Sequence, residues 1–147
     1  MRLSLSSADL QAWNGDVLVV GLLEGDAAGT ITQLEQRFPG LKAALDAQEF
    51  KGKASEQVVL TPLATAPAKV AVLGMGKAEQ LDLDGLRLAS ARAAKTAVGR
   101  TGRLGLLLPW DGLDPAGAAR SSAEAVQLSL YKDQRFRKDT EPRRVPD

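Results

Sequence analysis

The sequence contains no cysteine and no histidine. Without them the chain cannot build a Cys/His zinc site, a thiol nucleophile or a histidine-based catalytic triad. The absence of cysteine is compatible with a reducing compartment. The 147 residues still suffice for one domain, because a chain of this length buries about 68–70% of its unfolded surface without disulfides or metals.

Long apolar runs and an excess of one charge are also absent. Residues 1–5 lack the apolar core of a signal peptide, and no later run approaches the ~18 apolar residues of a membrane span. The 19 basic and 18 acidic residues give a net charge of +1, so no overall field directs the chain to nucleic acid or membrane. We therefore expect a cytoplasmic protein that binds neither.

Hydrophobic periodicity predicts alternating strands and helices. Aliphatic or period-two patterns predict strands over residues 1–6, 17–23, 56–61, 69–73 and 104–108. Helical spacing predicts a further turn or two over residues 41–47 and three amphipathic helices. Their expected buried faces are Ala27, Ile31, Leu34 and Phe38; Leu86, Ala89, Ala93 and Ala97; and Ala119, Ala123, Val126 and Leu130.

Local signals mark where these helices begin and end. Gly25 and Asp26 can cap the first, Asp82 or Asp84 the next, and Asp114 before Pro115 the last. The two stop signals are Pro39–Gly40 and Gly99.

The order of elements predicts an α/β fold with a mixed β-sheet of about five to six strands and helices on both faces. The short gap between the strands at 56–61 and 69–73 suits an antiparallel pair.

Residues 132–147 have a different character. Basic and acidic side chains alternate there, Phe136 and Val145 are the only strongly apolar residues, and Pro142 and Pro146 discourage regular structure. We interpret residues 1–131 as the folded domain and 132–147 as a charged linker. A nucleic-acid arm built on Phe136 is the alternative.

The turn formed by Gly74, Met75, Gly76 and Lys77 follows a strand and could face an anion. A Walker loop would need a glycine where Ala71 stands and a hydroxyl residue after the lysine, and a dinucleotide fingerprint would need another glycine after the turn. We favour a tight turn or an interface turn, with the anion-facing role of Gly74, Gly76 and Lys77 kept open.

The other polar candidates have structural explanations. The carboxylates that could bind a hard cation are better explained as helix caps and turn residues, and Trp110 is expected to cover a core edge or an interface. No nucleophile has a base beside it, so we assign no catalytic residue and no metal ligand.

Three segments follow one another in a recognisable order. They are residues 15–20, residues 50–53 with Glu56, and above all residues 69–77 (KVAVLGMGK) with the alanine-rich stretch that follows Leu86 and Arg87. In this order they resemble the N-terminal domain of the cytosol (leucyl) aminopeptidases, the M17 family of metallopeptidases. Residues 124–138 resemble the last helix of that domain and the interdomain segment. The similarity therefore spans nearly the whole chain.

The resemblance implies a macro-domain-like three-layer sandwich that precedes a catalytic domain absent from this chain. Members of the family remove N-terminal residues, preferably leucine, from peptides with two divalent ions, zinc or manganese, and assemble as hexamers. Their metal ligands and catalytic residues match nothing in this sequence, so the chain alone should be inactive and hold no cofactor. Its expected partners are its own catalytic domain and further copies of the parent, whose substrates are peptides.

Two other functions stay open. A stand-alone macro-like module could bind a nucleotide or ADP-ribose, with residues 74–77 facing the phosphates. A DNA-binding accessory could use the charged residues 132–147.

Overall fold

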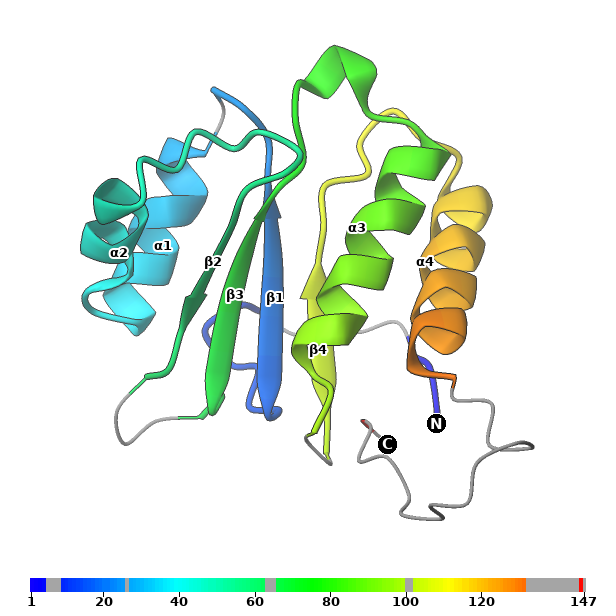
Figure 1. The fold of residues 1–147 in the computed structure, drawn as a ribbon, viewed down its shortest axis with the longest axis horizontal. Helices are drawn as coiled ribbons and strands as arrows, with labels where there is room; N and C mark the ends of the chain where they lie inside the picture. Colours follow the sequence, from blue (N-terminus) through cyan, green and yellow to red (C-terminus); the bar gives the residue numbers. More distant parts are fainter. Residues whose placement is uncertain (5–8, 26, 63–65, 100–101, 132–145, 147) are drawn as a thin grey trace, which may run out of the picture.

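The computed structural model describes residues 1–4, 9–25, 27–62, 66–99, 102–131 and 146. In this part of the chain four strands form one sheet, with two helices on each side (Figure 1). The strands are β1 (Val17–Leu22), β2 (Gln57–Leu60), β3 (Lys69–Gly74) and β4 (Leu104–Leu107). The helices are α1 (Ala28–Arg37), α2 (Leu41–Ala47), α3 (Leu83–Thr96) and α4 (Pro115–Leu130), with a 3₁₀ turn, η1 (Ala78–Gln80), after β3.

The sheet is mixed, with strand order β2-β3-β1-β4. Strand β1 runs parallel to β3 and to β4, and Val19 lies between Ala71 and Leu106. Strand β2 runs antiparallel to β3, as the short gap between them predicts. All six residues of β1 are buried, which confirms that its continuous aliphatic run marks a strand covered on both faces.

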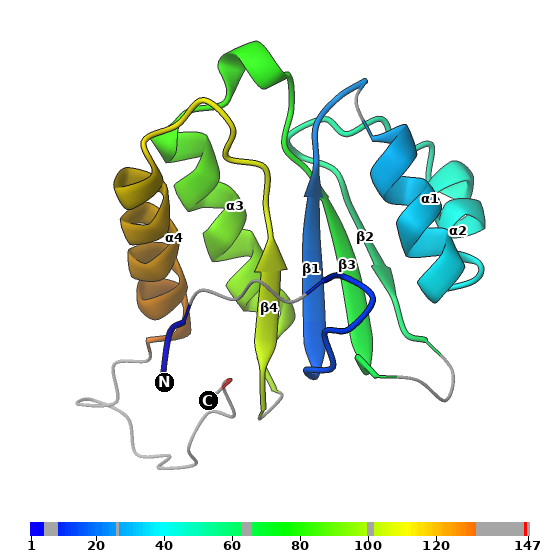
Figure 2. The same cartoon turned by 180° about the vertical axis from the view of Figure 1, so that it is seen from behind.

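Side chains of β1 point alternately to two helical layers, because successive residues of a strand face opposite sides. Leu18, Val20 and Leu22 pack in a core with α1 and α2, which contribute Leu34, Phe38, Leu41 and Leu45. Val17 and Val19 pack on the other side with Ala93 and Ala97 from α3 and its C-terminal cap. Figures 1 and 2 show the resulting three layers. The predicted α/β sandwich is confirmed.

The predicted starts of two helices are also confirmed. The Asp82 carboxylate accepts a hydrogen bond from the Gly85 amide at 2.7 Å, and Asp114 accepts one from Gly117 at 2.6 Å. Both are N-caps, which satisfy amides that have no partner inside the helix. Between α1 and α2, Gly40 takes φ 94°, a conformation that glycine adopts without strain.

The number of strands is lower than expected. Residues 1–4 form no strand, and residues 5 and 6 lie outside the described residues. Leu3 remains 45% exposed, so its alternation with polar neighbours does not mark a half-buried strand. The described sheet therefore has four strands where the sequence predicted five to six.

The buried face of α4 agrees with the expected one at Val126 and Leu130, which are buried, and differs at its other two positions. Ala119 is exposed and Ala123 only half-buried, while Ala118, Ser121 and Ala125 are buried. Helix α4 packs mainly on α3. Ala118 lies in a cluster with Leu86 and Ala89 of α3, and Val126 and Leu130 lie in another with Ala94. Small residues such as Ser121 are buried on this face as well, and hydrophobic periodicity does not count a serine as a core position.

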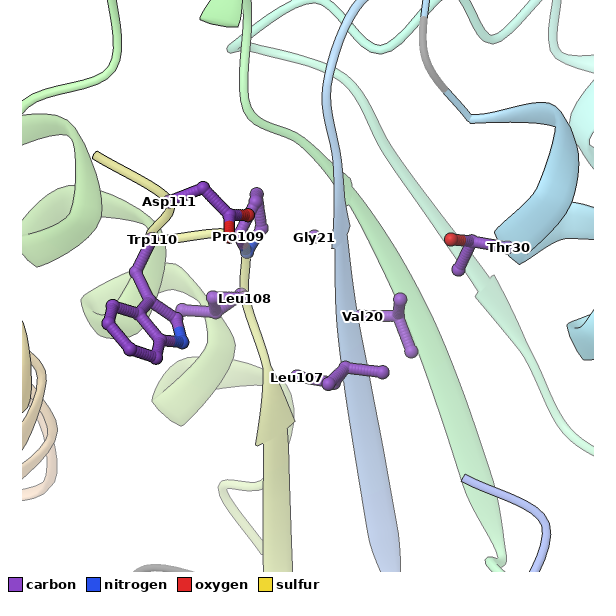
Figure 3. A pocket seen from close by; sticks show the side chains of 8 residues that line it. All are labelled: Val20, Gly21, Thr30, Leu107, Leu108, Pro109, Trp110 and Asp111. Atoms are coloured by element: carbon purple, nitrogen blue, oxygen red, sulfur yellow. The ribbon is translucent and has the colours of Figure 1, made fainter. Parts of the chain in front are cut away.

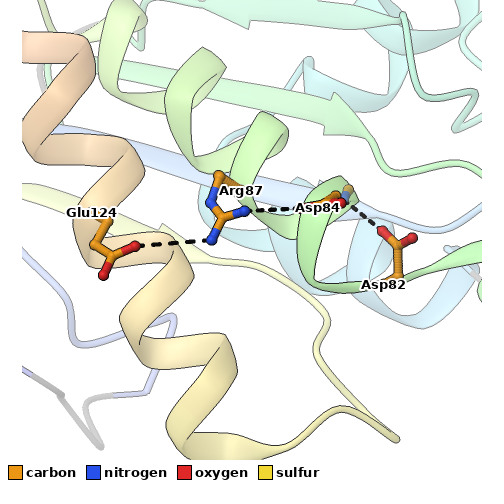
Figure 4. Close-up of polar contacts among 5 residues, drawn as sticks. Asp82, Asp84, Arg87 and Glu124 are labelled. Atoms are coloured by element: carbon orange, nitrogen blue, oxygen red, sulfur yellow. Dashed lines mark hydrogen bonds and ion pairs between the residues drawn. The ribbon is translucent and has the colours of Figure 1, made fainter.

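One charged group joins the two helices at the surface. The Arg87 guanidinium lies 2.8 Å from the Asp84 carboxylate within α3 and 3.9 Å from the Glu124 carboxylate on α4 (Figure 4). All three side chains are largely exposed, so water weakens the attraction and the pairs contribute little to stability. Burial of the side chains between α3 and α4 holds the helices together.

Some sequence predictions fall on residues that the structure does not describe. The linker at 132–147 lies outside the described residues except for Pro146, and so does Asp26 of the predicted first cap. Helix α1 begins after Ala27, which has no side-chain cap. Among the described residues, no helix has the length and apolar character needed to cross a membrane.

The same substitution at two alanines tests this packing. We expect Ala93→Leu to lower the free energy of unfolding by about 1–3 kcal/mol, because the fully buried site between α3 and the sheet has no room for three more carbon atoms. Ala119→Leu, on the exposed face of α4, should stay within about 0.5 kcal/mol of wild type. Urea unfolding followed by circular dichroism measures both, and equal losses would contradict this packing.

Candidate functional site

The turn that the sequence singled out lies where β3 leaves the sheet and leads to η1, at the carboxyl ends of the parallel strands (Figure 1). It lies against a second glycine loop, residues 51–56, which precedes β2. A Cβ atom on Gly74 would come within 1.8 Å of the Lys53 carbonyl oxygen, so only glycine allows this approach. Gly76 takes φ 77°, which lets the chain turn toward η1.

The backbone amides of the turn donate hydrogen bonds inside the protein. The Gly74 amide donates to the Glu56 carbonyl at 3.0 Å, and that of Met75 to Leu22 at 2.9 Å. The Gly76 amide donates to the Gly52 carbonyl at 2.8 Å. An anion-binding loop needs free amides, and these three instead join the ends of β1 and β3 to the second loop.

The second loop is held by an acidic and a basic side chain. The Glu56 carboxylate accepts hydrogen bonds from the amides of Lys51 at 2.7 Å and Lys53 at 3.0 Å. Desolvation alone would raise the pKa of Glu56, but these hydrogen bonds outweigh it and the pKa lies below its ordinary value of 4.5.

Arg92 on α3 holds the same loop from the other side. Its guanidinium donates to the carbonyls of Ala54, Ser55 and Glu56. Burial lowers the pKa of Arg92, but arginine stays charged at any physiological pH. The loop is therefore fixed by groups that are all engaged within the domain.

Lys77 is the one candidate of the turn whose functional group faces solvent. Its side chain is exposed, and no hydrogen bond or ion pair of its ammonium group occurs among the described residues. An anion at this turn would therefore depend on the lysine side chain rather than on the loop amides. The anion-facing or interface role of Gly74, Gly76 and Lys77 stays a prediction.

A groove that the sequence did not reveal lies one strand away. It has a volume of about 290 Å³ and is formed where β1 and β4 end, with Val20, Gly21, Thr30 and the segment 107–111 lining it (Figure 3). Trp110, which was expected at a core edge or interface, is 49% exposed at its rim. The groove forms because the ends of two strands lie side by side, and no local sequence motif predicts that arrangement.

The described residues do not fit a metal centre. The sequence offers no cysteine or histidine ligand, and no three carboxylates come together in the described part of the chain. Asp82 and Asp114 serve as helix caps and Asp84 pairs with Arg87. These carboxylates are used locally, and none of them converges on a common point.

Comparison with known proteins gives a consistent result. Residues 19–140 match the model of the cytosol aminopeptidase family, N-terminal domain. A probable cytosol aminopeptidase of Synechococcus sp. (strain CC9605) is 59% identical over 147 residues, which are 100% of this chain and 30% of that protein. One of Parasynechococcus marenigrum (strain WH8102) is 59% identical over 148 residues, with the same coverage. The chain thus spans about 30% of the length of these relatives.

Two solved structures have a similar fold. A mutant of tomato leucine aminopeptidase superposes with a TM-score of 0.76 at 24% identity, over 92% of this chain and 29% of that one. The bottromycin maturation enzyme BotP, solved in complex with Mn, gives a TM-score of 0.61 at 26% identity, over 84% of this chain and 24% of the other. The first likeness concerns the fold alone.

A pair of glycine substitutions tests the contact between the two loops. Gly74→Ala should destabilise the domain toward the upper end of about 1–3 kcal/mol, because the new methyl group meets a backbone oxygen that cannot rotate away. Gly29→Ala, in α1 with open space around it, should stabilise by about 0.5–1 kcal/mol. Thermal and urea unfolding report both changes. A Gly74→Ala domain as stable as wild type would mean that the loops do not touch in solution.

The Glu56 hydrogen bonds predict a pH dependence. A lowered pKa in the folded state stabilises the fold above the ordinary value of 4.5, and this stabilisation is lost as the pH falls through the folded-state value. The difference in urea midpoint between wild type and Glu56→Gln should therefore be larger at about pH 6 than at about pH 3. Glu79→Gln is the matched control, because no described residue donates a hydrogen bond to its exposed carboxylate. A constant difference between wild type and Glu56→Gln would refute this role.

Proposed function

The chain belongs to the cytosol aminopeptidase family and corresponds to its N-terminal domain, and we propose that it is the non-catalytic assembly or regulatory domain of a leucyl aminopeptidase. The observation that carries the proposal is the match of residues 19–140 to that domain, together with relatives of which the chain spans 30%. The members of this family are hydrolases and are named cytosol aminopeptidases. The proposed parent removes N-terminal residues, preferably leucine, from peptides in the cytoplasm.

The side chains of this chain suggest that catalysis belongs to another domain of the parent. Aminopeptidase activity in the parent would rest on two divalent ions, zinc or manganese, which act as Lewis acids and activate water. The described residues offer no suitable ligand set, so the ions would be held by the catalytic domain of the parent. BotP, one of the structural relatives, was solved in complex with Mn.

The domain itself would act through its surfaces. Its partners in this proposal are the catalytic domain of the same polypeptide and the other copies of a hexamer. Among the described side chains, several large apolar ones remain exposed on α3, on α4 and at the end of α4. They include Leu88 at 62%, Leu128 at 75% and Tyr131 at 68%. Exposed apolar groups of this size are suited to contacts with further protein.

The rival function, a stand-alone nucleotide or ADP-ribose module, has less support. It would place phosphates against residues 74–77, where the amides of Gly74, Met75 and Gly76 already donate to backbone carbonyls. Phosphate would therefore have to displace bonds that hold the sheet ends together. Membership of the aminopeptidase family needs no such rearrangement.

Deletion of this domain from the full-length protein tests the proposal. We expect the protein without residues 1–131 to lose its hexameric mass in light scattering and most of its hydrolysis of leucyl-p-nitroanilide in the presence of Mn²⁺ or Zn²⁺. The 147-residue chain alone should show no hydrolysis, which serves as the control for catalytic groups within it. An unchanged hexamer with normal turnover after the deletion would refute an assembly role.

A further inference from the structure

Asn14 is the only asparagine of the chain, and Gly15 follows it. In such a pair the backbone nitrogen of the glycine can attack the side-chain amide carbon of the asparagine, because the glycine has no Cβ atom that obstructs the approach. The attack closes a succinimide ring and releases ammonia, and water then opens the ring to aspartate or isoaspartate. The sequence thus contains one position where an uncharged amide can become a carboxylate without an enzyme.

The surroundings of this pair permit the reaction. Asn14 and Gly15 lie in the irregular segment between the turn at residues 10–12 and β1, and Asn14 is exposed. Within the described residues the Gly15 amide donates no hydrogen bond, so no described contact holds its nitrogen away from the Asn14 side chain. Solvent at the exposed side chain supplies the water that opens the ring.

A second pair shows how the structure can block the same chemistry. Aspartate before glycine closes the same ring with loss of water, and Asp84 is followed by Gly85. The Gly85 amide, however, donates to the Asp82 carboxylate at 2.7 Å in the first turn of α3. An amide that is engaged in a helix cap is not available to attack the preceding side chain. The described surroundings of Asn14 impose no such restraint.

Arg103 adds an activating contact at Asn14. Its guanidinium donates a hydrogen bond to the Asn14 side-chain oxygen. Attack by the Gly15 nitrogen moves negative charge onto this oxygen, and a charged donor that is already in place stabilises that charge, as an oxyanion hole does. Asn14 precedes β1 and Arg103 precedes β4, so the contact exists only because these strands are parallel neighbours in the sheet (Figure 1).

We propose that Asn14 is a site of spontaneous deamidation in the folded domain and that Arg103 promotes the step. The Gly15 nitrogen loses its proton to water and forms a bond to the Asn14 Cγ atom, and the Asn14 Nδ2 atom leaves as ammonia. One water molecule then adds to the imide. Asparagine and water therefore give aspartate or isoaspartate and ammonia. The proposal concerns this chain itself and is independent of the aminopeptidase function.

The two products affect the fold differently. Aspartate keeps the backbone and turns the contact with Arg103 into a surface ion pair, which changes stability little. Isoaspartate adds a carbon atom to the backbone directly before Gly15, which is buried. A Cβ atom on Gly15 would already lie 2.2 Å from the Trp13 ring and 2.9 Å from the Arg103 carbonyl oxygen, so a longer backbone has no room there. The isoaspartate form is therefore the less stable product.

Deamidation rates of arginine variants test the proposal. The folded 147-residue chain is incubated at mildly alkaline pH, and mass spectrometry of tryptic fragments measures the carboxylate at residue 14. We expect deamidation in wild type and a rate several-fold lower in Arg103→Met. The decrease should be smaller than the about 100-fold lost with a buried oxyanion donor, because water also reaches the exposed Asn14. Arg103→Lys, which keeps a charged donor, should recover part of the rate.

Two controls separate the effect of the fold from that of the sequence. Arg120→Met removes an exposed arginine from α4 and should leave the rate unchanged. In concentrated urea, wild type and Arg103→Met should deamidate at equal rates, because residues 14 and 103 no longer meet. Both Arg103 variants keep the backbone amide and carbonyl that bond to Asp16 and Val17, and circular dichroism verifies that they fold.

Other outcomes overturn the proposal. An amide at residue 14 that persists in the folded chain but is lost in urea would mean that the fold protects this pair. Equal rates in folded wild type and folded Arg103→Met would rule out activation by the guanidinium. A faster rate in folded Arg103→Met would mean that the hydrogen bond restrains Asn14 rather than activates it.

Discussion

Burial of β1 between two helical layers is the constraint on which the rest of the domain depends. Each of its six residues is buried. Its side chains pack alternately against α1 and α2 on one face and against α3 on the other. At roughly 25 cal/mol per Å² of apolar surface, burial of such a strand stabilises the fold strongly. It requires helices on both faces of the sheet, and the chain supplies them on its way from β1 to β3 and from β3 to β4.

The glycine turn after β3 shows how a loop that resembles a phosphate-binding motif can use its backbone amides inside the protein. Its amides bind the ends of β1 and the loop before β2, and Gly74 touches the backbone at Lys53. Hydrogen bonds made inside the protein remove the donors that a phosphate would need. This use of the turn is compatible with the proposed assembly role of the domain.

The sequence alone determined what depends on neighbouring residues. The strand at β1, the caps at Asp82 and Asp114 and the buried face of α3 follow from periodicity and from local hydrogen bonds. The tertiary structure alone decided which face of α4 is buried, how the turn at Gly74 uses its amides, and that β4 lies beside β1 at one end of the described sheet. These features depend on groups far apart in the chain, whose approach is fixed only when the layers pack.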